Sequence, residues 1–123
     1  MLTEDYCDFE TAKLLKEKGF DEAIDLWYDE NGDKFFAHHC NIRQDWRVRQ
    51  NQKVYQCPTI QMACKWLREK YNILIVVDRG VSFYTWQLEN NTTGEYIEDF
   101  IGEVPTYEGA VEAACLYVLK NLI

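Results

Sequence analysis

The chain has 123 residues, of which 47% are hydrophobic and 15% aromatic, and its net charge is -8. This length and apolar content predict one globular domain over residues 1–123 and exclude the weakly hydrophobic class of disordered chains. The charge is arranged acid–base–acid: residues 1–33 hold eleven acids against three lysines, 34–56 five bases against one acid, and 89–123 seven acids against one lysine. Because phosphates repel net negative charge, general nucleic-acid binding is disfavoured.

The cysteines and the amino-terminal residues indicate the compartment. The chain has five cysteines, an odd number that leaves at least one thiol outside any set of internal disulfides. Glu4 and Asp5 stand where a secretory signal would be basic, and the longest apolar run, Ile73–Val77, is far shorter than a membrane span. We therefore expect reduced thiols, no membrane association and a cytoplasmic location.

The first expected element is a helix over residues 8–18. Asp8 suits its N-cap, where the carboxylate accepts a backbone hydrogen bond. Gly19 suits the left-handed residue that ends a helix, and Phe20 can then fold back onto Leu15, as in a Schellman motif.

A β-hairpin is expected next. Apolar and polar residues alternate over 24–29, which predicts a half-buried strand with Trp27 on the face opposite Tyr28. Asn31-Gly32 predicts a type I′ turn with positive φ at both residues, and residues 34–39 form the return strand. Alternation at 45–49 predicts a third strand, with Trp46 toward the core and the arginines outward, and Val54-Tyr55 a short fourth.

The second half repeats this order. Pro58-Thr59 precedes a helix whose apolar residues are spaced for one face. The run 73–77 is apolar on both faces, which predicts a central strand; 81–88 returns, a polar loop comes next, and 96–97 adds a short edge strand. Pro105-Thr106 opens the last helix, which reaches nearly to the end of the chain.

These elements predict an α+β fold of three helices packed on a mostly antiparallel sheet, in the order α-ββ(β)-α-ββ(β)-α. One helical phrase occurs in both halves: residues 12–18 read Ala-Lys-Leu-Leu-Lys-Glu-Lys and residues 64–70 read Cys-Lys-Trp-Leu-Arg-Glu-Lys. Either the two halves are a duplication, or the phrase reflects the residues that favour amphipathic helix ends. It predicts two comparable helices on a sheet, the second nearer its centre, and gives no argument for two equivalent sites.

No catalytic or metal motif stands out. The nearest is His38-His39-Cys40 with Cys57 and Cys64, but its spacing does not match a structural zinc site. The glycines form no phosphate loop, and Ser82, the one serine, forms no nucleophile elbow. We expect no enzyme, catalytic residue, metal or cofactor; a metal- or thiol-dependent enzyme using Cys40 and Cys57 is the third hypothesis.

The candidate interaction surface is the basic segment 43–53, which interleaves cations with an aromatic ring. Its members are Arg43, Trp46, Arg47, Arg49 and Lys53. Proteins that bind single-stranded nucleic acids combine the same residue types, so nucleic-acid binding through 43–53 is the alternative function. The other interpretation is that these cations neutralise the acidic ends of the chain.

Three segments carry a resemblance to known proteins: residues 10–21, residues 58–69 with the phrase Pro-Thr-Ile-Gln-Met-Ala-Cys-Lys-Trp-Leu-Arg-Glu, and the tail from Tyr107 to Ile123. In these segments the chain resembles a family of small uncharacterised proteins carried by phages, prophages and mobile elements of gut anaerobic bacteria. The resemblance implies a bacterial cytoplasm and an accessory, non-catalytic product, and it assigns no site residue. With the aromatic content and the acidic ends, it favours a non-enzymatic protein-binding module that acts on a host or phage component.

Overall fold

A computed structural model describes residues 4–123, and residues 100–102 by their backbone only. It divides the chain into two compact units: an amino-terminal unit, residues 6–59, and a carboxy-terminal unit, residues 60–123 with the preceding residues 4–5. Helices and antiparallel strands confirm the expected α+β class. The strands form two three-stranded sheets, so the expectation of a single sheet was wrong. The single domain over 1–123 stays a prediction.

The amino-terminal unit begins with helix α1, Phe9–Glu17. The Asp8 carboxylate accepts a hydrogen bond from the Thr11 N–H at 2.8 Å, which confirms the predicted N-cap. Gly19 has φ 93°, its N–H donates to the Lys16 carbonyl, and the Phe20 N–H donates to the Leu15 carbonyl at 2.9 Å. These two bonds define a Schellman motif, and Leu15 and Phe20 are both buried, as expected.

The sheet of this unit has the order β2-β1-β3, with β1 at Leu26–Tyr28, β2 at Lys34–Phe36 and β3 at Tyr55–Gln56. Both pairings are antiparallel. The buried core of the sheet comprises Ala12, Tyr28 and Cys57, against which Phe9, Leu26 and Tyr55 pack. The Tyr28 hydroxyl donates to the Cys7 carbonyl at 2.6 Å, which ties the sheet to the residues before α1.

The hairpin between β1 and β2 is confirmed, but its turn is of a different type. Gly32 has φ 86°, whereas Asn31 is not among the residues with positive φ. The Gly32 N–H donates to the Asp29 carbonyl, and the Asp29 carboxylate accepts from the N–H groups of Asn31 and Asp33. The Asp29 side chain thus favours a three-residue loop with one left-handed glycine over the two-residue type I′ turn.

The predicted strand over 45–49 is wrong, because this segment is helical. A 3-10 helix, η1, covers His39–Gln44, and a short helix, α2, covers Trp46–Arg49. The Asp45 carboxylate accepts a hydrogen bond from the Arg47 N–H at 2.9 Å, so Asp45 caps α2. Trp46 is 53% exposed and does not face the core, contrary to the expectation from alternation.

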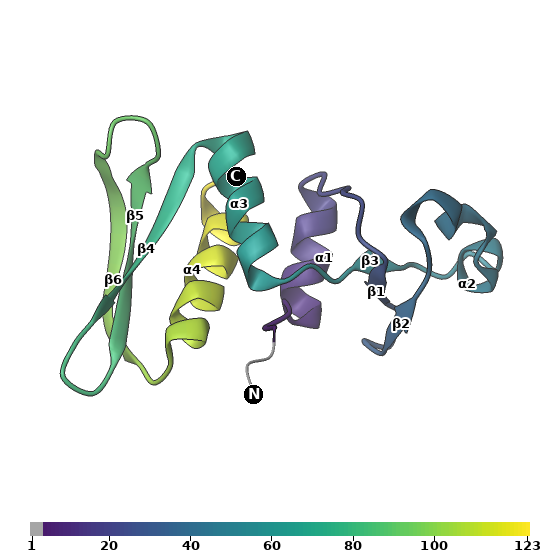
Figure 1. Ribbon diagram of the computed structural model, residues 1–123, viewed down its shortest axis with the longest axis horizontal. Coiled ribbons are helices and arrows are strands. Elements are labelled where there is room, and N and C mark those ends of the chain that lie inside the picture. Colours follow the sequence, from purple (N-terminus) through teal and green to yellow (C-terminus); the bar gives the residue numbers. More distant parts are fainter. Residues whose placement is uncertain (1–3) are drawn as a thin grey trace. The chain divides into compact units, whose positions relative to one another are not determined.

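The carboxy-terminal unit contains helix α3, Ile60–Tyr71, and helix α4, Tyr107–Asn121. Both lie on one face of the three-stranded sheet of this same unit (Figure 1). Helix α3 begins directly after Pro58-Thr59, as expected, and buries Ile60, Ala63, Trp66 and Leu67. The Thr106 hydroxyl accepts from the Gly109 N–H at 3.0 Å, which confirms the predicted start of α4.

The second sheet has the order β4-β5-β6, with β4 at Ile73–Arg79, β5 at Tyr84–Asn90 and β6 at Tyr96–Val104. The predicted central strand, β4, lies at an edge, and β5 is central. The expected edge strand at 96–97 is the start of the much longer β6. Val81, expected to begin the return strand, is 93% exposed in the turn before β5.

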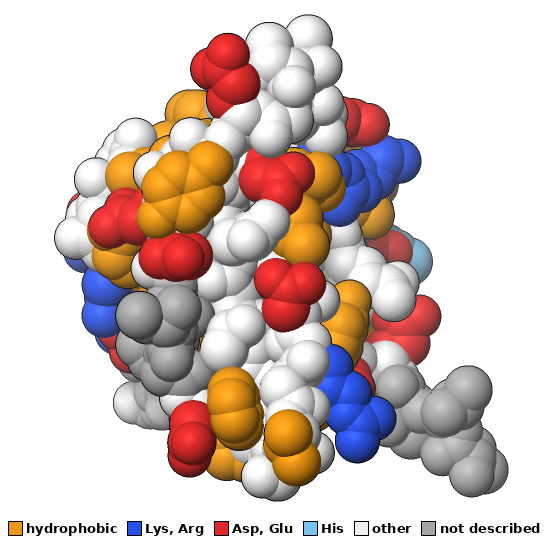
Figure 2. All heavy atoms as spheres, turned by 90° about the vertical axis from the view of Figure 1, so that its left-hand side faces the viewer, with side chains coloured by type: hydrophobic (Ala, Val, Ile, Leu, Met, Phe, Trp, Pro, Cys, Tyr) orange, Lys and Arg blue, Asp and Glu red, His pale blue; other side chains and the backbone are white. Residues whose placement is uncertain are grey.

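The two faces of this sheet differ. Trp86 and Leu88 of β5 are buried against the helices, and the Trp86 ring lies 5.3 Å from the Tyr117 ring of α4. The opposite face is open to solvent, and Figure 2 looks onto it, with carboxylates scattered among apolar side chains. From the register and the two-residue period, its members are Leu74, Val76, Asp78, Thr85, Gln87, Glu89, Tyr96 and Asp99.

Candidate functional site

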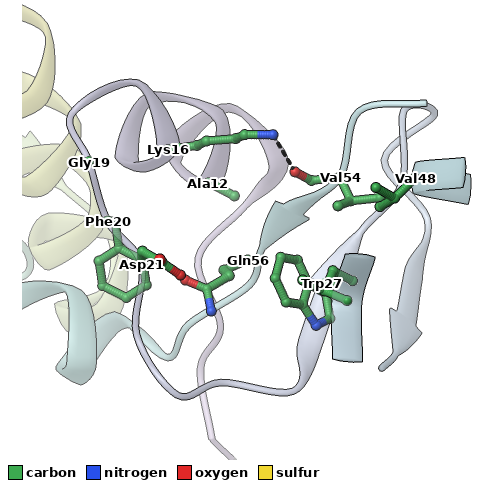
Figure 3. A pocket seen from close by; sticks show the side chains of 10 residues that line it. Ala12, Lys16, Gly19, Phe20, Asp21, Trp27, Val48, Val54 and Gln56 are labelled. Carbon is green, nitrogen blue, oxygen red and sulfur yellow. Dashed lines mark hydrogen bonds between the residues drawn. The ribbon is translucent and has the colours of Figure 1, made fainter. Parts of the chain in front are cut away.

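A pocket of about 360 Å³ lies within the amino-terminal unit (Figure 3). Its lining comes from α1, β1, β3, the two helical turns of 39–49 and the segment after α1. The lining residues are Ala12, Lys16, Gly19, Phe20, Asp21, Trp27, Ile42, Val48, Val54 and Gln56. Most of them are apolar, and the volume is within the range of about 300–1,000 Å³ that is typical of ligand pockets.

Trp27 gives the pocket an aromatic wall. The side chain is 6% exposed, and its indole Nε1–H donates to the Ala37 carbonyl at 2.8 Å. The His39 ring stacks on it with the centroids 6.3 Å apart and the planes at 11°. The indole is thus held by the backbone that follows β2 and by the His39 ring of η1, so this wall of the pocket is preformed.

Gln56 is a polar lining residue whose side-chain amide forms its hydrogen bonds within the protein. Its Oε1 accepts from the Glu22 N–H at 3.0 Å, and its Nε2 donates to the Glu22 carbonyl at 2.5 Å and the Ile24 carbonyl at 3.4 Å. These bonds hold the segment after α1 against β3. Because the amide is occupied, this wall offers a ligand mainly apolar contact.

Lys16 supplies a cation on the α1 side. Its Nζ donates to the Val54 carbonyl at 2.9 Å and lies 5.0 Å from the centroid of the Tyr55 ring (Figure 3). Burial, and secondly the charge of Lys53, lower the pKa of Lys16 below its ordinary value of 10.5. An ammonium group has three N–H donors and Val54 uses one, so the others can meet a carboxylate of a ligand.

Acids and histidines meet on the segment that leads from α1 to η1. His39 Nε2 lies 2.6 Å from the Asp21 carboxylate, and His38 Nδ1 lies 3.4 Å from that of Asp25. The His39 backbone N–H donates to Asp25 at 2.8 Å, and this bond, followed by the His38 contact, lowers the pKa of Asp25. These contacts fix η1 beside Trp27.

The candidate interaction surface borders this pocket through its helices, but its residues do not line it. Ile42 of η1 and Val48 of α2 are the lining residues of the segment. Their neighbours Arg43, Trp46, Arg49 and Lys53 are exposed. Pocket residues were missed because the strand prediction for 45–49 put Val48 on the core face without showing which space it would enclose.

Arg47 has a structural position, unlike the outward position expected for it. Its Nη1 lies 3.3 Å from the Asp45 carboxylate, and its guanidinium carbon lies 3.9 Å from the centroid of the Phe35 ring and 4.7 Å from that of Trp46. The side chain is 20% exposed. Arg47 therefore anchors α2 to β2, and the exposed cations of the segment are Arg43, Arg49 and Lys53.

The positions of the cysteines and of the possible metal ligands bear on the third hypothesis, a thiol- or metal-dependent enzyme. The five cysteines all lie within the described residues and form no disulfide; Cys40 is exposed, and Cys57 is buried, where its Sγ donates to the Cys7 carbonyl at 3.7 Å. Burial raises the pKa of the Cys64 thiol to about 11, against the opposing charge of Arg68. Among the described residues, no three His, Cys, Asp or Glu side chains are grouped to hold a metal ion.

Comparison with known proteins adds no relative. No protein-family model, curated protein or solved structure matches the chain. The resemblance to phage proteins therefore stays a prediction. Within residues 4–123, no helix is long and apolar enough to cross a membrane.

Proposed function

We propose that the chain is a non-enzymatic protein-binding module, and that its pocket in the amino-terminal unit takes an apolar side chain of a partner protein. The observation that carries this proposal is the apolar pocket itself, with Trp27 as a preformed wall. Large apolar side chains that enter such pockets supply much of the binding energy at protein interfaces. The resemblance favours a host or phage component of a bacterial cytoplasm as the partner.

Lys16 and Lys53 favour a carboxylate beside that apolar side chain on the α1 side of the pocket, whereas Asp21, the acid in the lining, is in contact with His39 at 2.6 Å. Lys16 lines the pocket with two N–H donors left over, and Lys53 is close enough for its charge to affect the Lys16 pKa. A hydrogen bond from an ammonium to a carboxylate is stronger than a neutral one and gives specificity. The preferred partner segment therefore carries Asp or Glu next to Leu, Phe or Trp.

The test is selection of short peptides from a random displayed library on the full chain. We expect the enriched peptides to pair an apolar or aromatic residue with a neighbouring acid. Val48→Trp fills the pocket from α2 and should abolish their binding, whereas Arg49→Trp adds the same ring at the next, exposed position and should leave binding within about twofold, as surface changes usually do.

Two results would contradict the proposal. One is a selection that enriches no peptide, and the other is a set of peptides that bind the two tryptophan variants equally. Lys16→Met should weaken the acidic peptides by about tenfold, with Lys13→Met, a lysine of the exposed side of α1, as its control. Equal effects of both lysine variants would argue against the carboxylate.

The exposed Trp46 favours nucleic-acid binding as a second candidate function. The ring is 53% exposed, and Arg43, Arg49 and Lys53 are exposed in the same segment. Bases stack on such rings while cations follow the phosphates. Retention of single-stranded DNA or RNA at low salt, lost in Arg43→Ala/Arg49→Ala, would support it; Arg47 is unsuited to this test because it anchors α2.

A further inference from the structure

The two edges of the sheet β4-β5-β6 are protected to very different degrees. The β6 edge pairs with β5 through a ladder with register shifts at two places. It also carries the charges of Glu98, Asp99 and Glu103. Charges and irregular register are the devices by which proteins prevent a sheet edge from pairing with another strand. The β6 edge is therefore blunted.

The β4 edge is more regular, and its charged residues, Asp78 and Arg79, lie together at its carboxy-terminal end. Its pairing with β5 runs without interruption from Ile73↔Asn90 to Arg79↔Tyr84. Residues 73–77 are all aliphatic, without Pro, Gly or a charge. In the part of the chain that the structure describes, β5 is the only strand that pairs with β4. The outer edge of β4 therefore presents a regular row of backbone donors and acceptors.

Side-chain burial agrees with an incomplete sheet edge. Ile75 and Val77 point to the same face as the buried Leu88 and Trp86, their partners on β5. Both nevertheless remain half-buried. Val76 on the open face is also half-buried. An added strand would cover apolar surface on both faces of β4 at once.

We propose that β4 pairs antiparallel with β4 of a second copy, so that two sheets of three strands join into one of six. A twofold axis at Val76 gives an antiparallel register in which aliphatic residues occupy the centre. In that register Ile75 lies opposite Val77, Leu74 opposite Asp78 and Ile73 opposite Arg79, so no charge faces a like charge. A closed twofold dimer needs one surface that can pair with itself, and the aliphatic residues 73–77 meet this need without like-charge repulsion.

The test is the mass of the full chain in solution by analytical ultracentrifugation, with reductant present because Cys40 is exposed. We expect the mass to rise with concentration from 14.6 kDa to twice that value. Val76→Lys puts two like charges opposite each other at the axis and should weaken dimerisation by at least about tenfold. Thr85→Lys adds the same charge to the same open face on the central strand and should preserve the dimer.

Amide hydrogen exchange of the unsubstituted chain makes the test independent of how the variants fold. Protection of β4 amides should increase with protein concentration, whereas protection of β6 amides should not. A monomer at all concentrations, equal weakening by both lysine variants, or protection that rises at β6 and not at β4 would overturn the proposal. None of these results bears on the pocket, which lies in the other unit.

Discussion

The helices α1 and α3 share one sequence phrase, a buried leucine and a left-handed residue after their last turn, but the elements that follow them differ. Leu15 and Leu67 occupy the same position in the phrase, and both are fully buried. Both helices are followed by a left-handed residue, Gly19 with φ 93° and Asn72 with φ 59°. Asn replaces Gly here because, of the residues with a Cβ, it adopts this conformation most readily.

The difference lies in the elements that come after each helix. After α1, strands of two or three residues alternate with η1 and α2, and this irregular layer encloses the pocket. After α3, strands of seven to nine residues form a continuous meander whose core is closed by α4. Lys16 lines the pocket, whereas its counterpart Arg68 belongs to a unit built of regular elements. The pocket thus lies in the unit whose helices and strands are shortest.

The largest expected effect would test whether the two phrases are equivalent in packing. Leu15→Ala and Leu67→Ala should each lower the free energy of unfolding by about 2–5 kcal/mol, because each removes a fully buried side chain and leaves a cavity. Denaturant unfolding monitored by circular dichroism measures both. A loss under about 1 kcal/mol for either variant would contradict the equivalence.

A smaller effect would test the two helix ends. Gly19→Ala should lower the free energy of unfolding by about 1–2 kcal/mol, because alanine is strained at positive φ. Gly19→Asn introduces the residue type that ends α3 and should cost less than half as much, by roughly the αL preference of Asn. The same unfolding measurement compares them, and equal costs would show that the α1 end requires glycine itself.

The smallest effect concerns the Lys16 charge. Because its folded-state pKa is lowered, the unfolded chain binds more protons between that pKa and 10.5, so this group adds stability as pH rises through that interval. NMR titration of the lysine side chains should place the Lys16 midpoint below 10.5. Lys53→Met should move the Lys16 midpoint upward, since it removes the second cause of the shift. An unchanged midpoint would show that the charge of Lys53 does not act on Lys16.

Local signals in the sequence were sufficient for three helix ends. Asp8 and Thr106 cap their helices through backbone hydrogen bonds within four residues, and Gly19 acts within the same short range. Interactions this local depend little on the rest of the fold. The order of the main helices and strands was predictable for the same reason.

Most of the errors lie where longer-range contacts decide. At 45–49 the alternation outweighed a local signal, the Asp45 N-cap, and it could not reveal that Arg47 would pack on Phe35. The aliphatic run of β4 suggested a central strand, because sequence alone does not show that Leu74 and Val76 point to an open face. Trp27 was placed opposite the core because the residues that enclose it, Ile42 and Val48, come from a distant segment.

The central claim is that the pocket beside Trp27 receives the partner. The most direct measurement is an NMR titration of the full chain with the tightest peptide from the selection, following the indole Nε1–H signals of Trp27, Trp46, Trp66 and Trp86. We expect Trp27 to shift, since its indole lines the pocket, and Trp66 and Trp86 to remain unchanged. A shift confined to Trp46 would place binding on the exposed basic segment, and it would contradict the claim, as would no shift at all.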